Sequence, residues 1–174
     1  MLWVNHNIII NVIAFQIIWW AGVLAGNQLL YIPGLLLIWH FIVSRQRVLD
    51  IKVMLSCTII GVLVDLTLTL TGLFDFTVVP IWLLLLWCYF AISLNYSLSI
   101  FSGLPIIVQV LVGGVFGSLS YLAGANFGAV DFPHGDLFTT AILAIIWALL
   151  MPLFFHIAKF IRHKHEVKQI AQLI

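Results

Sequence analysis

The chain has 174 residues, of which 64% are hydrophobic and only 7% charged, and its formal net charge is +1. Soluble domains carry about 25% charged residues, and a chain of this length cannot bury so much apolar surface in one water-soluble core. The composition therefore excludes an ordinary soluble domain and predicts that lipid surrounds most of the chain. The net charge of +1 itself says little about nucleic acid, and we expect no nucleic-acid partner.

Six segments are long and apolar enough to be membrane spans, for which about 20 residues cross a hydrocarbon core of about 30 Å. Glycine, proline or charged residues separate them. The second segment is short and contains Pro33-Gly34, so it fits either a kinked crossing or a re-entrant segment. We therefore predict an all-α domain with spans at 7–25, 27–43, 53–73, 80–99, 105–123 and 137–160, followed by a basic tail over 161–174.

The basic residues indicate how these spans are oriented. All seven lysines and arginines lie either between the second and third spans or from Lys159, at the very end of the sixth span, onward. The positive-inside rule makes both regions cytoplasmic. Two regions on the same side must be separated by an even number of spans, and four spans separate these. We expect both termini to be cytoplasmic, and the acidic residues Asp75, Asp131 and Asp136 to lie outside.

Asp65 is the only ionisable residue deep within a predicted span. A charge at such depth costs at least about 2.5–3.5 kcal/mol on insertion scales, and such residues usually face the bundle interior. Helical spacing places Thr58, Gly61 and Thr69 on the same face as Asp65, while leucines occupy the other faces. Asp65 is predicted either to carry a proton or bind a ligand, or, in the alternative, only to tie helices together.

Amide side chains are the other candidates for an intramembrane site. Gln16 lies in the middle of the first span, Asn11 nearer its cytoplasmic end, and Asn95 and Gln109 toward the cytoplasmic ends of the fourth and fifth. Their shared depth with Asp65 suggests a cavity open to the cytoplasm. The alternative is hydrogen bonding between helices, which is worth about 0.6 kcal/mol per contact.

The fifth span carries a pattern typical of close helix packing. Gln109, Gly113, Gly117, Ser120 and Gly124 recur every three or four residues, and small residues on one face let helix backbones approach closely. The partner is either another span, which we favour, or a second copy of the chain. Tyr121 is expected to point its hydroxyl toward the membrane interface.

Motifs for metals, cofactors and common enzymes are missing from the sequence. It has no HExxH, GxSxG, P-loop or dinucleotide-binding pattern. We therefore expect no metal site and no cofactor, and no active site of the type found in soluble enzymes.

Several residue combinations together resemble one known family. The resemblance rests on Phe15-Gln16 with Trp19, Val64-Asp65, Pro80, Trp82, Trp87, Phe90-Ala91, Leu94-Asn95, Ser97, Gly113-Gly114, Gly117, Leu119-Ser120-Tyr121, Ala123-Gly124, Gly128-Ala129, Trp147-Ala148 and Pro152. This set is similar to the bacterial membrane family called domain of unknown function 2878. The resemblance implies a bacterial inner-membrane location and brings no established activity. The loop after Leu73 looks short for the family.

Three functions fit these features. The first is a membrane protein that binds or carries a small or lipid-like ligand near Asp65, Gln16 and Asn95. The second is an enzyme, or an accessory subunit, that acts in lipid or isoprenoid metabolism with Asp65 as acid or base. The third is a scaffold without a ligand. Membrane lipids are the expected surroundings in each case, and a homo-oligomer or a partner from lipid metabolism is compatible with all three.

Overall fold

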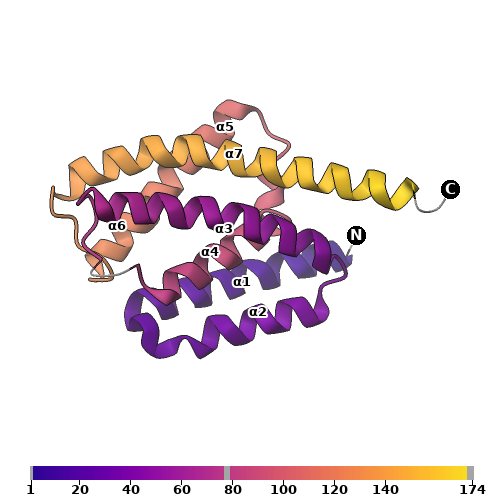
Figure 1. The fold of residues 1–174 in the computed structure, drawn as a ribbon, viewed down its shortest axis with the longest axis horizontal. Coiled ribbons are helices and arrows are strands. Elements are labelled where there is room, and N and C mark those ends of the chain that lie inside the picture. Colours follow the sequence, from indigo (N-terminus) through magenta and orange to yellow (C-terminus); the bar gives the residue numbers. More distant parts are fainter. Residues whose placement is uncertain (1, 77–78, 172–174) are drawn as a thin grey trace.

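The computed structural model describes residues 2–76 and 79–171, so the last three residues of the expected basic tail lie outside the described part. The prediction of an all-α fold is confirmed, and Figure 1 shows how the helices are arranged. The α-helices are α1 (Leu2–Ala25), α2 (Tyr31–Val43), α3 (Arg47–Leu70), α4 (Ile81–Ser93), α5 (Ile106–Val112), α6 (Ser118–Asn126) and α7 (Asp136–Ala171). Two 3₁₀ turns, η1 (Gly26–Leu29) and η2 (Ser97–Phe101), and one π-helical turn, η3 (Gly113–Gly117), complete the described elements.

Among the described residues, four stretches of helix are long and apolar enough to cross a membrane, namely Ile8–Leu29, Arg47–Leu70, Ile106–Asn126 and Asp136–Lys168. The third of these joins α5, η3 and α6 into one rod. By contrast, α2 and α4 have 13 residues each, which at 1.5 Å per residue gives about 20 Å. The two short helices fall within the second and fourth expected spans.

The chain runs back and forth between two ends of the molecule (Figure 1). At one end, the loop after α3 meets the loop after α6, and the backbone N–H of Asp75 donates to the carbonyl of Asp131 at 3.0 Å. At the other end, Arg162 of α7 donates to Asn95, which donates to Asp50 of α3. The two basic segments of the sequence therefore lie at the same end.

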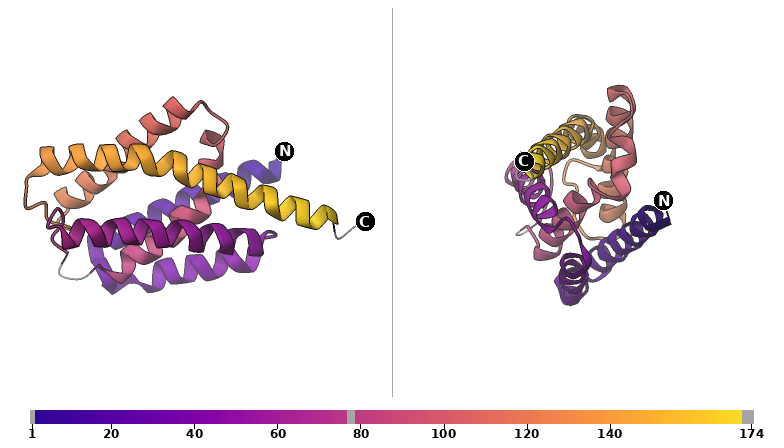
Figure 2. Two further views of the ribbon diagram at one scale, coloured as in Figure 1. Left: turned by 45° about the horizontal axis from the view of Figure 1, so that its top comes forward. Right: turned by 90° about the vertical axis from the view of Figure 1, so that its right-hand side faces the viewer.

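Helix α4 lies at the centre of the packing, in contact with α1, α2 and α3. Its sequence is apolar on all sides, as expected for a helix surrounded by protein, and eight of its 13 residues are buried. The view along the bundle places α3 and α7 on one side of it and α1 on the other (Figure 2, right). Large aliphatic side chains such as Leu63, Leu70 and Leu149 are exposed on the outside, as lipid-facing residues would be.

Glycines on α3 and on the α5–η3–α6 rod bring these elements close to tryptophans of neighbouring helices. A Cβ atom on Gly61 of α3 would lie within 3.0 Å of three carbons of the Trp87 indole in α4. A Cβ on Gly117 would meet the Trp147 indole of α7 in the same way, and one on Gly113 would meet the backbone of Trp147. The packing partner of these two glycines is thus α7 of the same chain.

Candidate functional site

Asp65 is almost completely buried, with 1% of its surface exposed, so its predicted inward orientation is confirmed. The Trp87 Nε1–H group donates to its Oδ2 atom at 2.6 Å, and the Tyr121 hydroxyl donates to its Oδ1 atom at 2.7 Å. Hydrogen bonds to an ionised acceptor are short and strong, which offsets part of the cost of removing the carboxylate from water. The expectation that Tyr121 points to the membrane interface is wrong, because its hydroxyl has this buried partner.

Stacked aromatic rings hold both donors in place. The indole of Trp87 lies parallel to that of Trp147, with ring centroids 5.4 Å apart and an angle of 6° between planes. The Tyr121 ring stacks on Phe74 at 5.3 Å and 15°. Phe74 in turn stacks on Phe132. Because these rings come from both loops at one end of the bundle, the loops and the Asp65 site are packed as one unit.

A cavity of about 450 Å³ is lined by Trp87 and Tyr121, the two residues that donate hydrogen bonds to Asp65. Its wall is formed by α1, α4, η2, the α5–η3–α6 rod and α7, and it reaches from Ser97 of η2 to Val130 in the loop after α6. Most of the wall is aromatic and aliphatic. The Asp65 carboxylate itself is not part of the wall, because its two hydrogen-bond donors stand between it and the space.

The cavity opens sideways between α1 and the α5–η3–α6 rod. Val12 on α1 and Phe116 on the rod both line the cavity, yet they are 43% and 69% exposed, so they form its rim. One hydrogen bond crosses between the two walls, from Trp19 Nε1–H to the Ser120 hydroxyl at 2.9 Å. The opening therefore faces the flank of the bundle rather than either end.

The amides and Thr69 are distributed over several places. Gln16 is exposed and lines the cavity, whereas the buried Asn11 accepts a hydrogen bond from the Ser97 hydroxyl. Gln109 donates to the carbonyl of Leu104, just before its own helix. Thr69 donates to the backbone carbonyl of Asp65. Of the candidate ligand residues, only Gln16 therefore faces the cavity.

The stripe of small residues on the fifth span also divides between roles. Gly113 and Gly117 pack on α7, as described above, while Ser120 binds Trp19. Gly124 lines the cavity, and a Cβ atom on it would meet no atom within 4 Å. The stripe therefore serves both the packing against α7 and the wall of the cavity.

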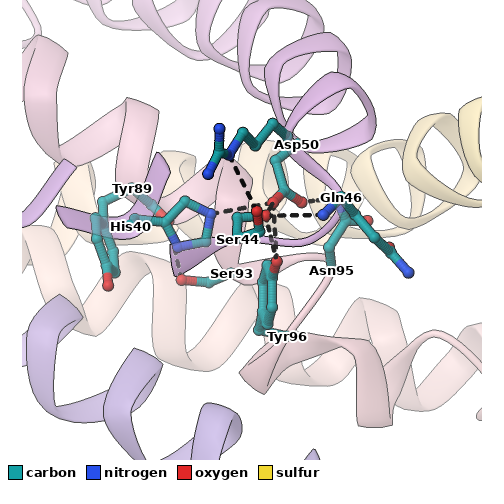
Figure 3. Close-up of polar contacts among 9 residues, drawn as sticks. His40, Ser44, Gln46, Asp50, Tyr89, Ser93, Asn95 and Tyr96 are labelled. Atoms are coloured by element: carbon teal, nitrogen blue, oxygen red, sulfur yellow. Dashed lines mark hydrogen bonds and ion pairs between the residues drawn. The ribbon is translucent and has the colours of Figure 1, made fainter. Parts of the chain in front are cut away.

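A second buried carboxylate belongs to Asp50, which the sequence suggested was part of a loop. Asp50 lies in the first turn of α3 and is fully buried. Its Oδ2 atom accepts hydrogen bonds from the hydroxyls of Ser44 at 2.6 Å and Tyr96 at 2.8 Å, and lies 3.1 Å from His40 Nε2. Asn95 donates to Oδ1 at 3.1 Å. Figure 3 shows these side chains converging on Asp50.

This Asp50 network joins four parts of the chain at the basic end of the bundle. His40 comes from α2, Asp50 from α3, and Asn95 and Tyr96 from the turn after α4, while Arg162 of α7 donates to the side-chain Oδ1 atom of Asn95 at 3.2 Å. A carboxylate whose two oxygens meet several donors is well suited to fix helix ends relative to one another. The signal in the sequence that could have indicated this network is the presence of polar residues, Ser44, Asp50 and Tyr96, near the ends of three different helices.

Side chains that could ligate a metal ion are not clustered in the described part of the chain. Within residues 2–76 and 79–171, no group of three or more His, Cys, Asp or Glu side chains could hold a metal ion. Asp65 has two neutral donors as neighbours, and the Asp50 oxygens are already occupied by donors. Both carboxylates thus act as hydrogen-bond acceptors in this structure.

Over residues 2–76 and 79–171 the protein is therefore all-helical, with four helices that are long and apolar enough to cross a membrane and with the buried carboxylates of Asp50 and Asp65 between them. The chain belongs to the family described as Protein of unknown function (DUF2878), whose family model matches residues 8–153. No curated protein and no solved structure matches the chain.

Proposed function

We propose that this chain is a multi-pass protein of the bacterial inner membrane that binds one lipid-like molecule in the cavity beside α1. In this proposal the chain crosses the bilayer six times, both termini are cytoplasmic, and the ligand enters sideways from the bilayer. The Asp50 network then lies at the cytoplasmic end and the Asp65 site nearer the outer end.

The distribution of charge supports this orientation. The basic segments that contain Arg47 and Arg162 lie at one end, and the loops that contain Asp75 and Asp131 lie at the other. Basic residues are concentrated on the cytoplasmic side of membrane proteins. The short helix α4 is enclosed by other helices, so it needs little contact with lipid to cross.

The dimensions and lining of the cavity support a lipid-like ligand. Its volume of about 450 Å³ falls in the range of about 300–1,000 Å³ that is typical of small-molecule sites, which are mostly apolar with a few polar groups. It is elongated, since it extends along the bundle from Ser97 to Val130. Its rim, at Val12 and Phe116, faces the surface that would contact acyl chains.

Gln16 is the single observation that favours a ligand over a scaffold. Its side chain is exposed on the apolar helix α1, in the wall of the cavity, and none of the hydrogen bonds among the described residues involves it. An amide left without a partner in an apolar medium costs roughly 2–7 kcal/mol. A scaffold gains nothing from this arrangement, whereas a ligand with a polar group would supply the missing partner.

The proposal can be tested by filling the cavity. Gly124→Leu places a side chain in the cavity from a position where a Cβ atom meets nothing within 4 Å. Bromododecanol is a suitable probe, because bromine quenches tryptophan on contact and four of the seven tryptophans line the cavity. These are Trp19, Trp82, Trp87 and Trp147.

We expect saturable quenching in the wild-type protein in detergent and at least about tenfold weaker binding in Gly124→Leu, since one filled site must exclude the chain. Gly34→Leu is the matched control, because a Cβ at Gly34 of α2 also meets nothing within 4 Å and Gly34 does not line the cavity. It should bind as the wild type does. Quenching that is linear and equal in all three proteins would show only partition into the micelle and would refute the proposal.

A further inference from the structure

The polar groups in the wall of the cavity restrict the chemistry of the ligand, and this inference rests on the proposed function. Tyr121 lines the cavity and has one hydroxyl hydrogen, which it donates to Asp65 Oδ1. A phenolic oxygen can also accept hydrogen bonds. Among the described residues, that oxygen receives none. Toward the cavity, Tyr121 can therefore only accept.

Trp87 and Asp65 together fix the direction in which the Tyr121 hydroxyl hydrogen points. The indole N–H can only donate, and it donates to Asp65 Oδ2. Asp65 thus has a donor on each oxygen, and its ionised form, which only accepts, satisfies both. The buried carboxylate fixes the direction of the Tyr121 hydroxyl without touching the cavity. Asp65 is a positioning residue, and Tyr121 is the residue that meets the ligand.

We propose that the cavity selects a long-chain molecule whose polar group is a hydrogen-bond donor, such as an alcohol, and discriminates against ethers and anionic heads. A hydroxyl can donate to the Tyr121 oxygen, whereas an ether oxygen would face a lone pair and leave the acceptor without a partner. A carboxylate or phosphate head would in addition meet the negative charge of Asp65 behind Tyr121. Gln16, which also lines the cavity, can donate or accept and so accommodates the second hydrogen bond of an alcohol.

Asp65→Asn should reverse the direction of the Tyr121 hydroxyl. Because Trp87 can only donate, the amide oxygen of the new side chain must face Trp87, and its NH₂ group must face Tyr121. The Tyr121 oxygen then accepts from this NH₂ group, and its own hydrogen turns toward the cavity. The variant should therefore bind an ether more tightly than the wild-type protein does. A purely structural role of Asp65 would not change the preference between two ligands.

The experiment compares bromododecanol, bromododecyl methyl ether and bromododecanoate as quenchers of tryptophan fluorescence in the purified full chain. The wild-type protein should bind the alcohol about tenfold more tightly than the ether, the equivalent of one hydrogen bond, and more tightly than the carboxylate. In Asp65→Asn the ether should gain affinity until the two neutral probes bind about equally. Tyr121→Phe should lower the alcohol to the level of the ether, and this variant tests the inference even if Asp65→Asn does not fold.

Matched controls are Asp75→Asn in the exposed loop after α3 and Tyr31→Phe on the exposed surface of α2, both of which should retain the wild-type preference. If no probe shows saturable binding to the wild type, the proposed function fails and the inference with it. If all three probes bind equally and neither Asp65→Asn nor Tyr121→Phe changes this, the cavity binds apolar chains but the inference is refuted. Tightest binding of the carboxylate would also refute it.

Discussion

Gly61→Ala should break the link between Trp87 and Asp65 without altering either residue. The added Cβ would lie within 3.0 Å of three carbons of the Trp87 indole, a distance at which one group must move. The indole cannot move away freely, because it is stacked on Trp147. A displaced indole loses its 2.6 Å hydrogen bond to Asp65.

The magnitude follows from three contributions. Overpacking costs about 1–3 kcal/mol, and loss of a hydrogen bond between membrane helices costs about 0.6–1.7 kcal/mol. Replacement of a helical glycine by alanine restores about 0.5–1 kcal/mol. We expect a net destabilisation of about 1–4 kcal/mol, most of it from overpacking.

Thermal unfolding in detergent, followed by circular dichroism, measures this effect against Gly34→Ala. A Cβ at Gly34 meets nothing within 4 Å, so this control should unfold at the wild-type temperature or slightly above it. Equal stability of the two variants would show that the Trp87 indole does not resist the added methyl group. A destabilised Gly61→Ala whose tryptophan emission is identical to that of the wild type would also contradict the prediction, because the indole would not have moved.

Two further predictions concern the basic end of the bundle and the orientation. Asp50→Asn places an NH₂ group among hydrogen-bond donors and should lower the free energy of unfolding by about 1–3 kcal/mol. Asp75→Asn, in an exposed loop, should change it by at most about 0.5 kcal/mol. Equal unfolding temperatures of the two variants would contradict the prediction for Asp50. With both native cysteines replaced by alanine, a membrane-impermeant thiol reagent added to whole cells should label His134→Cys and not Lys168→Cys, and the reverse pattern would contradict the orientation.

The helical class and the burial of Asp65 could be predicted because both depend on local sequence. Hydrophobic length indicates spans, and the small residues around Asp65, such as Gly61, indicate which face of α3 turns inward. The exposed leucines on the other faces of α3 follow from the same periodicity, with Leu63 at 55% and Leu70 at 78% exposure.

The partners of Asp65 could not be predicted, because they depend on how helices distant in sequence pack together. Trp87 and Tyr121 are 22 and 56 positions away in sequence, and both residue types are common at membrane interfaces. That general tendency led to the wrong expectation for Tyr121. Amides are rare in apolar spans, so Asn95 was predicted to share a site with Asp65. In the structure it binds Asp50, at the opposite end from Asp65.

The burial of Asp50 was missed for a related reason. Its neighbours Arg47 and Lys52 are charged, so the segment has the composition of a solvated loop, and the expected third span began at residue 53. In the structure α3 begins at Arg47 and turns Asp50 inward. The donors that compensate its charge come from α2 and from the turn after α4, and no local sequence pattern around Asp50 predicts them.

An experimental density map of the protein purified with its native membrane lipids tests most directly whether the space between α1 and the α5–η3–α6 rod is a ligand site. We predict an elongated density that enters between Val12 and Phe116 and ends with a polar group at Tyr121. A map in which α1 closes onto the rod, with side chains filling the space and no additional density, would contradict it.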